Sequence, residues 1–253
     1  MFDRRAVSDA VAFVLVFSMI LMSIGLVYTF GMDSIGSMQT GEQLKNGERT
    51  FLTIERNFDD VRRREAPARS AEMNLNGGTI QVREGSSMWV SVDVAGGGYF
   101  NRTLQTNALS YSYRNTFIEY ESGTVFRRSD DASIMLTEPA LRCVDGDDDG
   151  VPEYAVVSVV RMVSPDTVIS GSGVVTITGE RTSSNLVFPA NRSDVGVDVT
   201  VSVAGPNEEG WNRKMDAADD WASTPSGNYT CQAPGGLDRV YVRRTVLNVS
   251  LNG

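Results

Sequence analysis

The chain has 253 residues, of which 41% are apolar, enough for one large or two small domains with a buried core. Its formal net charge of −9 and the shortness of its basic clusters argue against DNA or RNA binding, which requires a basic face, so we expect no nucleic-acid partner. The chain contains no histidine, which excludes a Ser-His-Asp triad, a Cys-His pair and any histidine metal ligand, and we expect no enzymatic activity.

The first element in chain order is an uncharged segment from Ala10 to Phe30. As a helix it rises about 31 Å, close to the hydrocarbon core of a bilayer at about 30 Å. A secretory signal peptide has a shorter apolar region and ends at a site of small residues, and Gly31-Met32-Asp33-Ser34 is a poor site of that kind. The sequence therefore predicts a transmembrane helix over residues 10–30 that stays in the mature chain.

The charges around this segment predict its orientation. Arg4 and Arg5 precede it, and the next basic residue after it is Lys45. Basic residues that flank a transmembrane helix favour the cytoplasmic side. We therefore expect a single-pass protein of the cell membrane, with its N-terminus in the cytoplasm and the bulk of the chain outside the cell.

The helical pattern continues beyond the membrane segment. Apolar residues recur there with the 3-4-3 spacing of one helix face, while charged residues fall elsewhere. The stripe consists of Phe51, Ile54, Phe58 and Val61. Ala66-Pro67 ends the pattern, since a residue before proline avoids the helical conformation. We predict one helix over residues 7–66, with an amphipathic stem over 31–66 whose stripe packs against the rest of the chain.

The residues Arg4-Arg5-Ala6-Val7-Ser8, followed at once by an apolar helix, resemble the class III signal of archaeal type IV pilins and archaellins. The similarity is greatest to haloarchaeal pilin-like surface proteins and covers residues 4–65. It implies that residues 1–6 are a leader and that a prepilin peptidase cuts between Ala6 and Val7. It also implies that the whole helix is retained and that a β-rich domain lies outside the cell.

Two functions are consistent with this reading. In the first, the chain is a non-enzymatic structural protein that leaves the bilayer by packing its helix against those of other pilin-like subunits, forming a surface filament. In the second, the apolar segment is an uncleaved anchor, and the β-rich domain is a binding or adhesion module. The composition does not separate the two.

After Pro67 the pattern changes to short alternating runs rich in Val, Ile, Thr and Tyr, separated by turn residues. The predicted strands are Thr79–Val82, Met88–Val94, Leu109–Arg114, Thr116–Glu121, Ser133–Leu136, Ala155–Val163, Val174–Gly179, Val197–Val203 and Arg239–Val249. A tight reversal is expected at Asn76-Gly77-Gly78, and Pro206–Trp221 is a second helical candidate. The expected fold class is α+β, with a mainly antiparallel, sandwich-like domain over residues 67–253.

The sharpest chemical feature is the acidic loop that begins at Asp145. Asp145, Asp147 and Asp149 alternate, and Gly150 permits a sharp turn, as in the first half of a D-x-D-x-D-G calcium loop. Glu153 falls at the ninth position, whereas the twelfth is Val156 in place of the usual glutamate. The alternatives are a Ca²⁺ site, the one cofactor that this sequence suggests, and a solvated acidic loop.

Cys143 and Cys231 are the only cysteines, and they either form a disulfide, as an extracellular domain permits, or stay as free buried thiols. Four sequons are consistent with a glycosylated extracellular domain. Their acceptors are Asn101, Asn191, Asn228 and Asn248.

The chain also uses some types of charged residue far more often than others. The chain has two lysines against 21 arginines, and 19 aspartates against 13 glutamates. An acidic surface with few lysines is typical of a protein from a salt-loving archaeon, where salt screens the self-repulsion of the surface. A GC-rich genome is the alternative explanation, although it does not account for the missing histidine.

Overall fold

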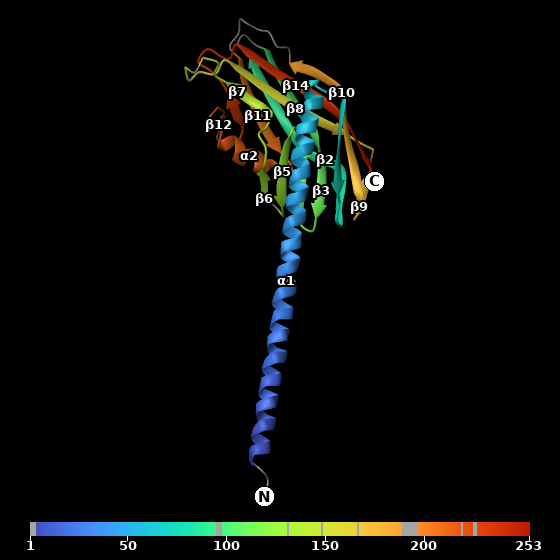
Figure 1. Cartoon of the computed structure of the whole chain (residues 1–253). Coiled ribbons are helices and arrows are strands. Elements are labelled where there is room, and N and C mark those ends of the chain that lie inside the picture. The colour runs from blue at the N-terminus through green and yellow to red at the C-terminus, as the bar shows by residue number, and fades with distance from the viewer. Residues whose placement is uncertain are drawn as a thin grey trace. The chain divides into compact units, whose positions relative to one another are not determined.

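The computed structural model describes the backbone of residues 4–94, 98–130, 132–147, 149–165, 167–188, 197–218, 220–224 and 227–253, and the side chains of these ranges except 4–10, 30–37, 98 and 99. The chain divides into two compact units, Met1–Lys45 and Asn46–Gly253. The first unit is helical, and the second combines helix with a mostly antiparallel, β-rich domain of curled sheets (Figure 1). The α+β class predicted from the sequence is therefore confirmed.

Helix α1 runs from Arg4 to Arg63, close to the predicted helix over 7–66. Its end is a Schellman motif, in which Arg64 adopts a positive φ of 73°. The amide of Arg64 donates to the carbonyl of Val61 at 3.3 Å, and the amide of Glu65 donates to the carbonyl of Asp60 at 2.9 Å. The helix therefore stops shortly before Pro67, as the sequence predicts.

The smaller sheet has five strands, and its spatial order is β1 (Ala68–Asn74), β10 (Val174–Phe188), β14 (Arg239–Asn252), β8 (Tyr154–Val163) and β7 (Leu141–Val144). All neighbours in this sheet are antiparallel except β14 and β8, which are parallel. This parallel pair was not anticipated, because nothing in either strand distinguishes a parallel neighbour from an antiparallel one.

The larger sheet has nine strands, all antiparallel to their neighbours. Its main path is β12 (Ala222–Ser223), β13 (Tyr229–Cys231), β11 (Val197–Ala204), β2 (Gly78–Val94), β3 (Gly98–Tyr113), β4 (Thr116–Glu121), β5 (Thr124–Ser129) and β6 (Ala132–Met135). The ninth strand, β9 (Val168–Gly171), pairs with the start of β2.

The predicted reversal at Asn76-Gly77-Gly78 carries the chain from one sheet to the other. The amide of Gly78 donates to the carbonyl of Leu75 at 2.7 Å, which closes a four-residue turn. Asn76 and Gly77 both have positive φ, 47° and 88°, a conformation that asparagine and glycine adopt most easily. The turn therefore links β1 to β2 although these two strands do not pair.

The main hydrophobic core lies between the two sheets. Alternate residues of β2 and β11 face alternate residues of β8 and β14 across it, as period-two strands require. Its members include Val90, Val92, Val157, Val199, Val201 and Val242. The short helix α2 (Glu208–Asp216) adds the buried side chains of Trp211 and Met215, so the predicted helical segment is confirmed in its central part.

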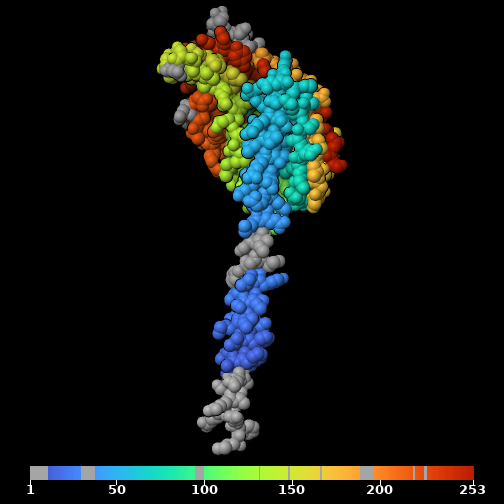
Figure 2. All heavy atoms as spheres, in the orientation of Figure 1, coloured from blue at the N-terminus to red at the C-terminus, as the bar shows by residue number. Residues whose placement is uncertain are grey.

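The last turns of α1 belong to the β-rich unit. The predicted stripe of Phe51, Ile54, Phe58 and Val61 is buried, with at most 1% of any of these side chains exposed. Figure 2 shows the light-blue last turns of α1 between the cyan segment that follows them in the chain and a yellow-green segment of the β-rich unit. Glu48 pairs with Arg127 of β5 at 2.9 Å, and Asn57 donates to the carbonyl of Ser70 in β1 at 3.1 Å. The prediction that the stripe packs on the β-rich part of the chain is confirmed.

Candidate functional site

The apolar segment of α1 covers Val11–Thr29 within the described residues, with a mean hydropathy of 2.5, and its side chains are exposed throughout. Two of its polar side chains are satisfied by the helix itself: the hydroxyl of Ser23 donates to the carbonyl of Ile20, and that of Thr29 to the carbonyl of Gly25. By length and composition the segment is able to cross a membrane, and an N-terminal signal sequence would meet the same criteria.

The predicted processing residues lie at the start of the same helix. The backbone is helical from Arg4 onward, through Arg5, Ala6 and Val7. Their side chains fall outside the described residues, so the cleavage between Ala6 and Val7 stays a prediction.

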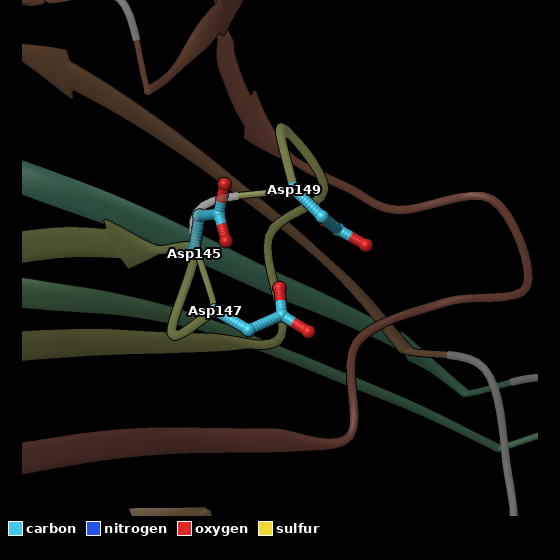
Figure 3. A group of neighbouring side chains, drawn as sticks. All are labelled: Asp145, Asp147 and Asp149. Atoms are coloured by element: carbon cyan, nitrogen blue, oxygen red, sulfur yellow. The ribbon is translucent and has the colours of Figure 1, made fainter.

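The acidic loop joins β7 to β8, and it brings Asp145, Asp147 and Asp149 together. One carboxylate oxygen from each lies within 4.8 Å of the others (Figure 3). The fourth predicted ligand, Glu153, is not part of this group. Its carboxylate lies against Gly146, where an added Cβ would come within 2.1 Å of Oε2 of Glu153.

Hydrogen bonds from backbone amides to aspartate side chains hold the acidic loop in a tight conformation. The amide of Gly150 donates to Oδ2 of Asp145 at 2.6 Å, and the amide of Val151 donates to Oδ1 of Asp149 at 2.8 Å. Gly150 itself has a φ of +86°, which explains the glycine at that position. The group brings together one oxygen from each of three carboxylates, fewer than the six to eight ligands that Ca²⁺ takes, so further carboxylate oxygens, carbonyls or water would have to complete its shell.

A disulfide joins Cys143 at the end of β7 to Cys231 of β13, with a Cα–Cα distance of 5.7 Å. The two strands belong to different sheets, so the bond links the edge of the five-stranded sheet to the nine-stranded sheet. It also lies two residues before Asp145, and it therefore fixes one end of the acidic loop.

The predicted glycosylation acceptors lie in different settings. Asn101 on β3 and Asn248 on β14 have exposed side chains, and Asn228 is partly buried just before β13. Asn191 falls outside the described residues.

The sequence analysis did not anticipate a buried polar cluster, which centres on Glu119 and Glu121 of β4. Neither side chain is exposed to solvent. Glu119 accepts from Ser110 at 2.8 Å and pairs with Arg83 at 2.8 Å, and Arg128 lies 3.5 Å away. Buried carboxylates of this kind need such partners, because removing a charge from water without compensation is costly.

Helix α2 completes the buried cluster. The side-chain amide of Asn207 donates to both glutamates at 3.1 Å, and the indole of Trp211 donates to Glu121 at 3.2 Å. Asn207 is the N-cap residue of α2, and the amide of Trp211, one turn into the helix, donates to its carbonyl at 3.0 Å, so the two side chains lie on the same side. The cluster thus attaches α2 to the sheet. In the sequence, the alternation of Glu119 and Glu121 suggests that both side chains face solvent. The one signal that could have indicated their burial is the four-residue spacing of Asn207 and Trp211, which donate to them.

The second feature that the sequence analysis missed is a cavity of about 440 Å³ lined by four arginines, which we call the arginine pocket. The arginines are Arg62 and Arg63 at the end of α1, Arg142 on β7 and Arg243 on β14. The hydroxyl-bearing residues Ser158 and Tyr241 also line it. In the sequence these arginines look like short, isolated basic groups, because three separate segments contribute them.

The model of a protein family described as a family of unknown function (DUF7289) matches residues 5–250. No curated protein and no solved structure matches the chain.

Proposed function

The chain belongs to the DUF7289 family, a family of unknown function, and we propose that it is a non-enzymatic, pilin-like protein of the cell surface. In this proposal a single N-terminal helix inserts the chain into the lipid bilayer, and the same helix packs against other pilin-like subunits in a surface filament. A prepilin peptidase first removes residues 1–6.

The observation that carries this proposal is the apolar segment Val11–Thr29. Its described side chains are all exposed, so the chain by itself leaves a long apolar surface uncovered. A surface of that size requires a bilayer or neighbouring apolar helices, because water around it is unfavourable. A pilin-like subunit has such cover before and after assembly, because lipid surrounds the apolar segment in the bilayer and neighbouring apolar helices surround it in the filament core.

The same helix also supports a structural role for the stem. Helix α1 is continuous from Arg4 to Arg63, and its last turns are buried within the β-rich unit. One helix therefore supplies both the apolar segment and part of the core of the β-rich unit.

The charges and the cysteines support the proposed orientation. Arg4 and Arg5 precede the apolar segment, which favours a cytoplasmic N-terminus. The disulfide between Cys143 and Cys231 fits an oxidising compartment outside the cytoplasm. In this proposal the β-rich domain is extracellular and glycosylated, its acidic surface is adapted to high salt, and its acidic loop binds Ca²⁺.

The experiment that tests the proposal is mass spectrometry of the intact chain purified from its native membrane. We expect the mature chain to begin at Val7. A variant with Arg5→Leu and Ala6→Leu should remain unprocessed, because the recognition residues at the cut are gone. Ala12→Leu makes a similar change inside the apolar segment and should be processed normally. Normal processing of the Arg5/Ala6 variant would overturn the proposal that the chain is a pilin-like protein cut by a prepilin peptidase.

Filament assembly needs a separate measurement. Surface material sheared from cells and pelleted should contain the chain that begins at Val7. A processed chain that remains entirely in the membrane fraction would contradict assembly while leaving cleavage intact.

The alternative is an uncleaved, single-pass surface protein whose β-rich domain binds a ligand. The arginine pocket is the observation that favours it, since a filament subunit has no need of such a cavity. A native chain that still carries Phe2 would support this alternative over the pilin-like function.

A further inference from the structure

The arginine pocket lies on one face of the five-stranded sheet, in two rows of cross-strand neighbours. The register places Arg142, Val156 and Tyr241 in one row, and Ser158, Arg243 and Leu186 in the next. Residues that alternate with them, such as Val157 and Val242, point into the core between the sheets. The pocket therefore occupies the opposite face, outside the main core.

The end of α1 forms the remaining wall. The guanidinium of Arg62 donates to the hydroxyl of Ser158 at 3.1 Å, which brings the last turn of the helix onto this face of the sheet. The side chain of Arg62 is only 16% exposed, so its conformation is restricted by the residues packed around it. The Schellman motif after Arg63 ends the helix at this point.

The charge of the pocket is the unusual feature, because the chain as a whole carries −9. Arg62 and Arg63 share one carboxylate, that of Asp59. Within the part of the chain that the structure describes, no carboxylate lies within 4 Å of the guanidinium of Arg142 or Arg243. Two arginines therefore face one cavity with no anionic partner of the chain's own.

The lining also defines what kind of anion fits. A guanidinium group presents paired donors that match the oxygens of a carboxylate, sulfate or phosphate group. Val156 and Leu186 add apolar surface, and the ring of Tyr241 adds a face on which a sugar or another ring can pack. A cavity of about 440 Å³ falls in the range of small-molecule sites.

We propose that the arginine pocket is a binding site for an organic oxyanion, a carboxylate, sulfate or phosphate group carried on a sugar-sized body. Arg142 and Arg243 bind the oxyanion, and Tyr241 and Leu186 contact the body that carries it. The site does not involve the apolar segment Val11–Thr29, so it stands whether or not the chain forms filaments.

The test is isothermal titration of the full chain in detergent micelles at low salt, with glucuronate and inorganic sulfate as probes. We expect saturable binding of glucuronate with one site per chain. The double variant Arg142→Gln/Arg243→Gln should weaken it by about tenfold or more, the loss expected when charge-assisted hydrogen bonds are removed. The matched control is Arg161→Gln/Arg244→Gln, which removes the same charge from β8 and β14 at residues outside the pocket lining, Arg161 exposed and Arg244 partly exposed. This control should change the affinity less than about twofold.

Two outcomes would overturn the proposal. Equal weakening in the two double variants would mean that the anions respond only to net charge, and failure of both probes to saturate would mean that no site exists. Circular dichroism and thermal melting must first show that each variant is folded.

A third variant tests whether Tyr241 contacts the sugar-sized part of the ligand that carries the oxyanion. Tyr241→Ala should weaken glucuronate binding several-fold more than sulfate binding, because only glucuronate carries a ring. Equal effects on the two probes would exclude a role for Tyr241 in contacting the ligand.

Discussion

The ring of Phe58 in α1 lies directly over the α-carbon of Gly179 in β10: a Cβ atom at Gly179 would lie 2.3 Å from Cε1 of that ring. Phe58 has no room to move aside, because it is only 1% exposed and packs edge-on against Tyr120, with 5.2 Å between the ring centroids. The absence of a side chain at Gly179 is therefore what allows the helix to approach the sheet this closely.

This contact predicts that Gly179→Ala destabilises the chain by about 1–3 kcal/mol, the usual cost of overpacking a filled core. The measurement is denaturant unfolding of the full chain in detergent, followed by tryptophan fluorescence. Gly173→Ala is the control, since a Cβ there would meet nothing within 4 Å. Equal stability of the two variants would show that the helix moves away from β10 freely.

The buried stripe of α1 predicts where the chain can be truncated. A fragment that begins at Asn46 keeps the whole compact unit, whereas one that begins at Ala68 lacks Phe51, Ile54, Phe58 and Val61. Removing even one buried phenylalanine costs about 3–5 kcal/mol, and a domain is stable by only about 5–15 kcal/mol. We expect a cooperative melt for the fragment 46–253 and none for 68–253. A cooperative melt of the shorter fragment would contradict a core role for the stem.

The disulfide predicts a redox-dependent stability. Cys143 and Cys231 are 88 residues apart in the sequence, and a loop of that size stabilises the folded chain by about 4 kcal/mol in the entropic model. We expect a reducing agent to lower the melting temperature of the native chain, and to leave that of Cys143→Ala/Cys231→Ala unchanged. The same shift in both proteins would mean that the reductant acts elsewhere.

Two aspartates predict a dependence of stability on pH. Asp198 of β11 lies directly opposite Asp93 of β2 in the ladder. Burial, and secondarily the charge of Asp93, raises the pKa of the Asp198 carboxyl above its ordinary value. The folded chain therefore holds this proton more tightly than the unfolded chain does. The penalty is absent below the ordinary pKa of aspartate and develops as the pH rises through the raised pKa.

Asp198→Asn should accordingly stabilise the chain at neutral pH by about 0.2–1 kcal/mol, the range for like charges opposite each other in a sheet. The gain should disappear under acidic conditions and shrink in high salt, which screens the repulsion. Unfolding curves at several pH values measure it, with the exposed Asp238→Asn as the control. A gain that is independent of pH would indicate a cause other than this charge pair.

The acidic loop predicts an effect of calcium at fixed ionic strength. If Asp145, Asp147 and Asp149 hold Ca²⁺, adding the ion should raise the melting temperature of the native chain, because a ligand that binds only the folded state stabilises it. Chelation should reverse the rise. Asp147→Asn should abolish it, and Glu72→Gln, which removes an exposed carboxylate on β1 at the opposite edge of the five-stranded sheet, should not. An unchanged melt of the native chain would exclude the site.

Local features of the sequence determined the helix and most of the strands. The 3-4-3 stripe of the stem and the proline after it predicted α1 to within three residues at each end. The alternating runs predicted strands that overlap the observed ones, since period and turn chemistry depend only on neighbouring residues. The strands that went unpredicted were short, such as β7 and β13, or rich in charged and polar residues, such as β1.

Only the tertiary structure decided which distant residues meet. The pairing of Cys143 with Cys231, the parallel contact of β8 with β14 and the burial of Glu119 and Glu121 beneath α2 all join segments that are far apart in the chain. The arginine pocket is the clearest case, because residues 62, 142 and 243 share a face only after the sheet has formed. A sequence specifies the period and polarity of each segment, whereas strand order and register decide which of its side chains become neighbours.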